Sequence, residues 1–400
     1  MRTLSFLALV VLAFACATGP TTDSVALTTP ASTVTVVYTN NSGQDLVLGF
    51  LQGVPKSAPN TVVTQLPWLK KGGSTPTWTV PTSVPAPTAG ASSIKNYTKD
   101  YLFEIKAGKT LTLEVPSYPT NNGFRCVVAE LVYRTKIVQV FTPKSGSPSN
   151  YLAFPDLATS AFVFDKFEAG LTQGTPGIWN ITAVDFVGIP MQLSKDGETV
   201  GFKSGVTAQG LFNELGSLPS PYAEGATQSP NTSSTTYRFF SPAHITNTST
   251  LFDAALTNDL QQLDSYTGTV KYGQYAFSSF TVTEKSSASP VRYAVSASVQ
   301  DGSTVTLDTV TSKRALNGRI GQFAGASQAA KTLGGMLSAA LCRGVIGTPS
   351  DWGDIVYSDL NCAKPWDYYQ NAPYDEYSKT VHQYSIDDKN YGFSYDDYFG

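Results

Sequence analysis

The sequence has little charge and few of the residues that hold metal ions. Charged residues make up 14% of its 400 positions, the formal net charge is −3, and there are only two histidines and four cysteines. Nucleic-acid binding needs a basic face, so this balance argues against DNA and RNA as partners. Common metal-site and phosphate-loop spacings are absent, so neither a metal nor an organic cofactor is expected. Uncharged polymers such as polysaccharides stay open as partners.

Long apolar runs are also lacking, apart from one at the N-terminus. Residues 4–14 are apolar, a basic residue precedes them and small residues follow. The run is too short to cross a bilayer and has the layout of a secretory signal cleaved after Ala15 or Ala17. A lipid anchor at Cys16 is the alternative. We therefore expect a signal peptide over 1–17 and a secreted, extracellular protein that leaves the membrane after cleavage.

The shortage of cysteine excludes a disulfide-rich scaffold. An oxidising compartment favours one disulfide, and we expect Cys342–Cys362 because both lie in the C-terminal segment. Cys126 is then free, or it takes one of these two partners. Asn-x-Ser/Thr triplets, the acceptors of N-glycans, occur at Asn40, Asn96, Asn180, Asn231 and Asn247.

Short strands broken by Pro and Gly fill the first half of the chain. Residues 32–41 alternate like a strand, and 44–53 follow after a Ser42-Gly43 turn signal, which predicts a hairpin. The same pattern continues in three further segments, 101–116, 125–141 and 161–170. Strands at this spacing favour an all-β sandwich or barrel.

The second half mixes strands and helices. Residues 251–263 have a helical period with N-cap candidates at Thr248 to Thr250. Residues 291–310 read as a hairpin that turns at Asp301-Gly302. Residues 326–344 predict a mostly buried helix despite a Gly-Gly pair.

One carboxylate is out of place in the run GIWNITAVDFVGIPMQL (177–193). An unpaired buried charge costs several kcal/mol, so Asp185 must be solvated, hydrogen-bonded or catalytic. On a continuous strand, Trp179 and Asp185 would share one face with Ile181, Ala183 and Val187, as a sugar-binding surface needs. The alternative is a solvated acid on an outward strand face.

Glu168, in FDKFEAG, is the second candidate acid. Two carboxylates suffice to hydrolyse a glycoside, one as proton donor and one as base or nucleophile. A serine hydrolase is disfavoured because no G-x-S-x-G is present, and His382, near Ser385 and Asp387, is interpreted as structural or groove-lining rather than as a triad member. The Tyr-rich end of the chain is interpreted as a closing strand, with sugar stacking as the alternative.

The blocks VDFVGIPMQL and YDEYSKTVHQYSIDDKNYGFSYDDYFG (374–400) resemble glycoside hydrolase family 64, the β-1,3-glucanases that release laminaripentaose. The resemblance covers most of the mature chain, from about residue 34 to the C-terminus. It implies a thaumatin-like β-barrel joined to a mixed α/β domain, with a wide acidic groove between them that binds β-1,3-glucan. A monomer is expected.

The resemblance also implies an inverting mechanism. By position, Glu168 matches the general acid and Asp185 the general base, and Thr172, Trp179 and Thr182 are the nearest occupants of the groove-lining positions. Two features depart from the family: Glu168 is followed by Ala-Gly-Leu-Thr rather than a β-branched polar strand, and the triplet at Asn180 lies beside the site, so Asn180 is expected unmodified or facing away.

Geometry constrains this pair. In a tight hairpin Glu168 would pair near Trp179, leaving Asp185 six residues further on, roughly 20 Å away. An inverting pair should sit ~6.5–9.5 Å apart. We therefore expect residues 169–178 to bulge as a longer loop, or the two strands to be offset or not neighbours; otherwise the assignment of Glu168 fails.

Five segments are predicted. They are the signal peptide 1–17, a flexible lead-in 18–33, a thaumatin-like β-barrel or sandwich domain 34–194, a smaller mixed α/β domain 195–325 with the groove between them, and a C-terminal segment 326–400 that completes the groove and the β domain. The alternative functions are a non-catalytic thaumatin-like protein that binds β-glucan or cell wall, and a structural or defensive surface protein with no sugar site.

Overall fold

The computed structural model describes most of the chain after residue 31. The described residues are 32–52, 68–70, 77–79, 102–117, 123–130, 163–170, 178–195, 197–228, 238–352, 354–355, 368–369, 372–388 and 390–393. The predicted signal peptide, Thr172 and Cys362 lie outside them, and of Cys126 only the backbone is described. The predicted disulfide therefore stays a prediction. No helix among the described residues is long and apolar enough to span a bilayer.

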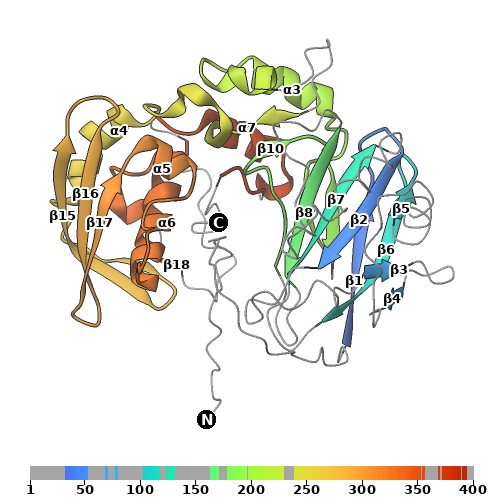
Figure 1. Ribbon diagram of the computed structural model, residues 1–400, viewed down its shortest axis with the longest axis horizontal. Coiled ribbons are helices and arrows are strands. Elements are labelled where there is room, and N and C mark those ends of the chain that lie inside the picture. The colour runs from blue at the N-terminus through green and yellow to red at the C-terminus, as the bar shows by residue number, and fades with distance from the viewer. Residues whose placement is uncertain are drawn as a thin grey trace, which may run out of the picture.

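Two sheets form the N-terminal half (Figure 1). Their strand orders are β12-β11-β1-β6 and β5-β2-β7-β8-β9, and all pairings are antiparallel. The bounds are β1 Ser32–Thr39, β2 Leu46–Gln52, β5 Leu102–Ile105, β6 Thr110–Ser117, β7 Gly123–Glu130, β8 Phe164–Gly170, β9 Ile178–Ile181, β11 Gln192–Lys195 and β12 Glu198–Gly201. A small ribbon pairs β3, Trp68–Lys70, with β4, Thr77–Thr79.

The two sheets pack face to face. Tyr38 of β1 stacks on Phe167 of β8 with ring centroids 5.9 Å apart, and both side chains are fully buried. Burying such side chains stabilises the fold by about 1.5–3 kcal/mol each. Among the described strands each sheet is open at both edges and no closed barrel forms. The result is a mainly β fold with some helices, and the thaumatin-like barrel stays a prediction.

The predicted hairpin between the first two strands is wrong. β1 pairs with β6 and β11, whereas β2 pairs with β5 and β7 in the other sheet. The turn itself exists: Gly43 has φ +77°, and the side-chain oxygen Oδ1 of Asn40 accepts from the Ser42 amide at 3.1 Å. Leu46, Val47 and Leu48 are fully buried, so β2 needs a strand on each side and lies inside its sheet.

The predicted glycan acceptor at Asn40 is corrected by the same turn. Its side chain is fully buried, and its amide nitrogen donates to the main-chain oxygens of Gln44 at 2.7 Å and Ile105 at 3.2 Å. A nitrogen held in this way is not available for a sugar.

A third sheet dominates the second half. Its order is β17-β16-β15-β14-β18, with β14 and β18 parallel and the other pairs antiparallel. The bounds are β14 Val270–Tyr272, β15 Tyr275–Ser286, β16 Arg292–Val299, β17 Thr304–Val310 and β18 Asp354–Ile355. The predicted hairpin over 291–310 is confirmed as β16–β17, and Gly302 in its turn has φ +82°.

The helix predictions were half right. The helix over 326–344 is confirmed as α6, Gln328–Arg343. Gly334 lets α6 pack closely against the backbone of Ile320, because a Cβ at residue 334 would lie 2.1 Å from the Ile320 carbonyl oxygen. The helix over 251–263 is broken into α4, Asp253–Asn258, and the 3₁₀ helix η7, Leu260–Leu263.

The N-cap prediction for α4 is wrong. Phe252 holds the N-cap position, while the Thr248 hydroxyl donates to the main-chain oxygens of Pro242 and Ile245. These bonds turn the chain before the helix begins. The other α-helices of the described residues are α3 Ala208–Gly216, α5 Ser312–Leu316 and α7 Glu376–Gln383.

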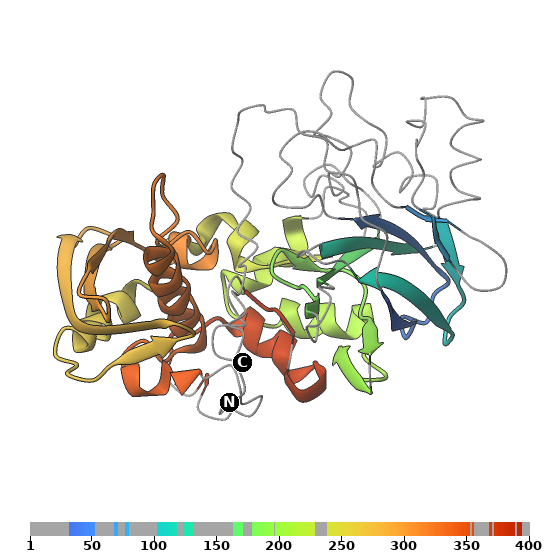
Figure 2. The ribbon, with the colours of Figure 1, turned by 90° about the horizontal axis from the view of Figure 1, so that it is seen from below.

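The buried side chains of the described residues form two hydrophobic cores. One lies between the N-terminal sheets and includes Tyr377 and Val381 of α7; the other joins the third sheet to α6 and includes Tyr368 and Phe393. The C-terminal stretch therefore packs into both cores, and Figure 1 shows α7 between the two halves. Seen from below in Figure 2, α6 lies against the third sheet. The predicted domain boundaries and groove stay predictions.

His382 is structural, as predicted. The side chain is buried, Nδ1 pairs with the Tyr369 hydroxyl at 2.9 Å and Nε2 with the Asn390 main-chain oxygen at 2.8 Å. Ser385 instead donates to the Val381 oxygen, so it forms no triad with His382. Of the predicted closing strand, Tyr391 makes an isolated bridge to Thr182, and residues after 393 lie outside the described part.

Candidate active site

Asp185 lies in a bend, not in a continuous strand. β9 ends at Ile181, and the chain bends at Val184 and Asp185 before β10, Phe186–Val187, which pairs with β13, Phe239–Phe240. The predicted common face that runs from Trp179 to Val187 is therefore wrong beyond Ile181. Two short strands that follow each other in the chain but belong to different sheets, β9 and β10, replace the one long strand.

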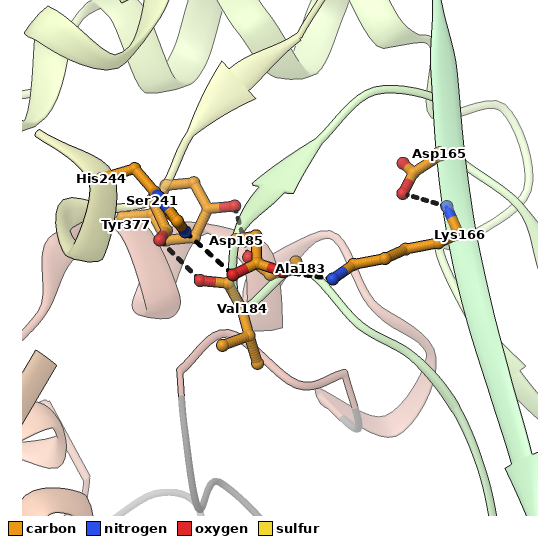
Figure 3. A network of polar contacts seen from close by, with 8 residues as sticks. All are labelled: Asp165, Lys166, Ala183, Val184, Asp185, Ser241, His244 and Tyr377. Atoms are coloured by element: carbon orange, nitrogen blue, oxygen red, sulfur yellow. Dashed lines mark hydrogen bonds and ion pairs between the residues drawn. The ribbon is translucent and has the colours of Figure 1, made fainter. Parts of the chain in front are cut away.

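Hydrogen bonds from distant parts of the chain hold this bend (Figure 3). The Tyr377 hydroxyl of α7 donates to the Ala183 oxygen at 2.8 Å, and the Ser241 hydroxyl donates to the Val184 oxygen at 2.6 Å. The Ser241 amide donates to the Asp185 oxygen at 3.0 Å. Buried main-chain groups need partners, and here those partners fix the direction of the bend.

The Asp185 carboxylate is paired on both oxygens. The Lys166 ammonium of β8 bonds Oδ2, and His244 Nε2 lies 2.8 Å from Oδ1. The side chains of Asp185 and His244 are 32% and 36% exposed, whereas that of Lys166 is 11% exposed. Of the states that the sequence left open for Asp185, the structure shows a hydrogen-bonded acid, and a third of its side chain still faces solvent.

These contacts keep Asp185 ionised. Burial alone would raise the pKa of Asp185, but the bond from His244 and the charge of Lys166 outweigh it and hold the pKa well below its usual range. An ionised carboxylate with an exposed edge can accept a proton from water, which is the task of a general base.

Asp165 is a buried anchor behind the site. One of its oxygens accepts the amides of Gly188 and Ile189, both at 2.8 Å, and the other accepts the Lys166 amide at 2.7 Å. These bonds tie the segment after Asp185 to β8. Burial raises the pKa of Asp165 to about 7, and the three amides and the Lys166 charge offset part of that rise.

Replacing Asp165 with asparagine should destabilise the protein more at pH 5 than at pH 8. A carboxyl whose pKa is about 7 when folded and 3.8 when unfolded stabilises the folded state below pH 4, and this contribution is lost as the pH rises through 7. Between pH 5 and pH 8 the loss amounts to about 3 kcal/mol at ~1.4 kcal/mol per pH unit. Urea unfolding of both proteins between pH 4.5 and 8 measures it, and a pH-independent difference would contradict it.

Glu168 lies in β8, two residues after Lys166. In the ladder it stands opposite Asn180, one position from the predicted Trp179, so β8 and β9 are direct neighbours and are not offset. The expectation that the two strands are offset or not neighbours is therefore wrong, and residues 171–177 of the expected loop lie outside the described part. The bend after Ile181 is the feature that returns Asp185 to β8. The side chain of Glu168 lies outside the described part, and its catalytic role stays a prediction.

The predicted binding residues are only partly described. Trp179 belongs to β9 by its backbone, and Thr182 is buried with 7% exposure. Thr172 lies outside the described residues. Among the described residues no group of three or more His, Cys, Asp and Glu is arranged to hold a metal ion.

Lys166 and His244 were missed by the sequence analysis. Lys166 stands two positions before Glu168, and residues at this spacing share a strand face, so an alternation argument could have found it. His244 follows Asp185 by 59 positions in a short 3₁₀ helix, and no local pattern connects the two.

Comparison with known proteins gives a consistent result. A family model described as "Beta-1,3-glucanase" of glycoside hydrolase family 64 matches residues 32–399. A laminaripentaose-producing β-1,3-glucanase solved with laminaritetraose has a TM-score of 0.58 at 16% identity, covering 92% of this chain and 93% of the other. A family 64 β-1,3-glucanase domain from Clostridium beijerinckii has a TM-score of 0.60 at 18% identity, covering 94% and 95%. No curated protein matches by sequence.

Proposed function

Because this chain belongs to glycoside hydrolase family 64 and is a glycoside hydrolase acting on β-1,3-glucan, we propose that it is a secreted, monomeric, endo-acting enzyme. Its products would be short oligosaccharides such as laminaripentaose, released with inversion. The glucan would lie in a groove between a thaumatin-like β domain and the mixed part, lined by Thr172 and Trp179. Similarity to solved family 64 enzymes supports the fold of this proposal.

The observation that carries the mechanism is the ionised, half-buried carboxylate of Asp185. It takes a proton from a water molecule whose oxygen attacks the anomeric carbon. On the opposite face of the sugar, Glu168 gives its proton to the glycosidic oxygen as that bond breaks. One water is consumed, and a proton exchange with solvent restores both acids.

Glu168 belongs to the same strand as Lys166, the residue that Asp185 contacts. Asp185 contacts Lys166, and Glu168 follows two positions further along the same strand, about 6.6 Å at ~3.3 Å per residue. Residues two apart belong to one face of a strand. The proposal therefore requires the Glu168 side chain to extend on the face of β8 that carries Lys166, with ~6.5–9.5 Å between the two carboxyl groups for the attacking water.

Purified protein incubated with linear β-1,3-glucan tests the proposal. Products separated by size should be short oligosaccharides, and proton NMR during the first minutes should show the new reducing end as the α-anomer. Linear β-1,4-glucan serves as the control substrate. A β-anomeric product would overturn the inverting mechanism. Retention on insoluble glucan without product would favour the non-catalytic binding protein.

A further inference from the structure

We infer that His244 is a positioning residue for the base: by donating from Nε2 to Oδ1, it sets the rotation of the Asp185 carboxylate. The inference rests on the proposed role of Asp185. Without a second donor, a carboxylate bonded to Lys166 through one oxygen could rotate about its Cβ–Cγ bond. With His244 on the other oxygen, both oxygens are fixed.

The chemistry of the contact defines the state of the imidazole. An ionised carboxylate only accepts hydrogen bonds, so Nε2, 2.8 Å from Oδ1, carries a proton. Each carboxylate oxygen has more than one accepting direction, and one donor on each leaves a direction for water. His244 can therefore orient Asp185 without displacing the reacting water.

The backbone around His244 is built into the same bend. His244 ends the 3₁₀ helix η5, Pro242–His244, and its amide donates to the Ser241 oxygen at 2.9 Å. Ser241 in turn donates to the main chain of Val184 and Asp185. One short turn therefore bonds both the backbone and the side chain of Asp185.

The mixed half of the molecule supports this turn. The Lys313 ammonium of α5 donates to the oxygens of Ala243 at 3.1 Å and Ile245 at 3.3 Å, on both sides of His244. The ring of Phe240 lies 6.1 Å from the imidazole. The position of His244 is thus set by the neighbouring core and does not depend on Asp185 alone.

Several charged and titratable groups surround Asp185 and His244, and the pH dependence of activity can test the inference. They are Lys166 and Asp165 from β8, Arg238 just before β13, Lys313 from α5 and Tyr377 from α7. Among the contacts that lower the pKa of Asp185, the hydrogen bond from His244 has the largest effect. Removing that donor should raise the pKa of the base and move the acidic limb of the activity profile to higher pH.

His244→Phe and His244→Gln form the matched pair of variants. Phenylalanine keeps a flat ring without a donor, whereas the glutamine amide can reach the place of Nε2. We expect kcat of His244→Phe on linear β-1,3-glucan to fall about 10- to 100-fold with KM little changed, because misplacement of a catalytic group by about 1 Å costs on that order. The acidic limb of kcat/KM should also move up, and His244→Gln should recover both partly.

The outcomes separate this inference from the proposed function. An inactive wild type would refute the function; an active wild type whose His244→Phe variant keeps the same kcat and pH profile would refute the role of His244. A loss equal in both variants, with an unmoved pH profile, would also overturn it. Thermal melting of each variant checks the fold.

A spectroscopic measurement tests the contact without activity. The chain has only two histidines, so ¹⁵N-histidine labelling gives two imidazoles, and the buried His382 is an internal control. Asp185→Asn should move the Nε2 signal of His244 and leave the signals of His382 in place. Unchanged His244 signals would contradict the bond on which the inference depends.

Discussion

Replacing Asp185 with asparagine should lower kcat on linear β-1,3-glucan by about 10²–10⁴-fold, the usual contribution of general acid–base catalysis. The amide keeps the shape of the side chain but cannot take a proton from water. Glu168→Gln should cause a loss of the same order, because its amide has no proton to give to the leaving oxygen. Release of reducing sugar, followed together with anomer analysis, measures both.

The variants Asp185→Asn and Glu168→Gln need a control for folding, because Asp185 bonds the nearly buried Lys166. In Asp185→Asn the Lys166 ammonium, whose side chain is 11% exposed, loses the carboxylate that it bonds directly, so some loss of stability is expected. Thermal melting and retention on insoluble β-1,3-glucan must therefore accompany the rates. A folded variant that still binds but no longer cuts supports a base. Unchanged product release from either variant would show that the acid is wrongly assigned.

Gly188→Ala should be the most damaging small substitution near the site. A Cβ at residue 188 would lie 2.2 Å from the Phe164 carbonyl oxygen of β8, and a strand backbone cannot move aside as a flexible side chain does. We expect a loss of about 3 kcal/mol in the free energy of unfolding, at the upper end for an overpacked interior. The kcat should also fall, because the Gly188 amide helps to tie the bend to Asp165.

Gly216→Ala is the matched control. Gly216 ends α3, its φ is not positive, and a Cβ there would meet nothing within 4 Å. Alanine should leave stability unchanged or raise it by about 0.4–1 kcal/mol, because it restricts the unfolded chain. Urea unfolding of both variants compares them. Equal stabilities would mean that β8 and the segment at Gly188 are not in close contact.

Elements that depend on neighbouring residues could be predicted from the sequence. The hairpin over 291–310 could be predicted from its alternation and its Asp-Gly turn, and the helix over 326–344 from its run of small and apolar residues. The partners of β1 and β2 could not be predicted, because a turn signal states where the chain turns but not which sheet receives the next strand. That choice depends on pairings more than 50 positions away, such as Leu46 with Ile105.

The candidate site divides in the same way. Asp185 could be found because a single acid in an apolar run needs an explanation. The bend that brings it to β8 could not, since it depends on Tyr377, 194 positions away, and on Ser241, 57 positions away. His244 could not be predicted for the same reason, because it lies 59 positions from Asp185 in the sequence and reaches the carboxylate only in the folded chain.

The hydrogen bond from Tyr377 to the bend has a consequence for the order in which the enzyme is made. Ribosomes deliver α7 after β8 and β9, so a nascent chain can pair these two strands before Tyr377 exists. Until α7 docks, Ala183 lacks the hydroxyl that fixes the turn towards Asp185. The proposed base is therefore positioned only after α7 has docked, later than the pairing of β8 with β9.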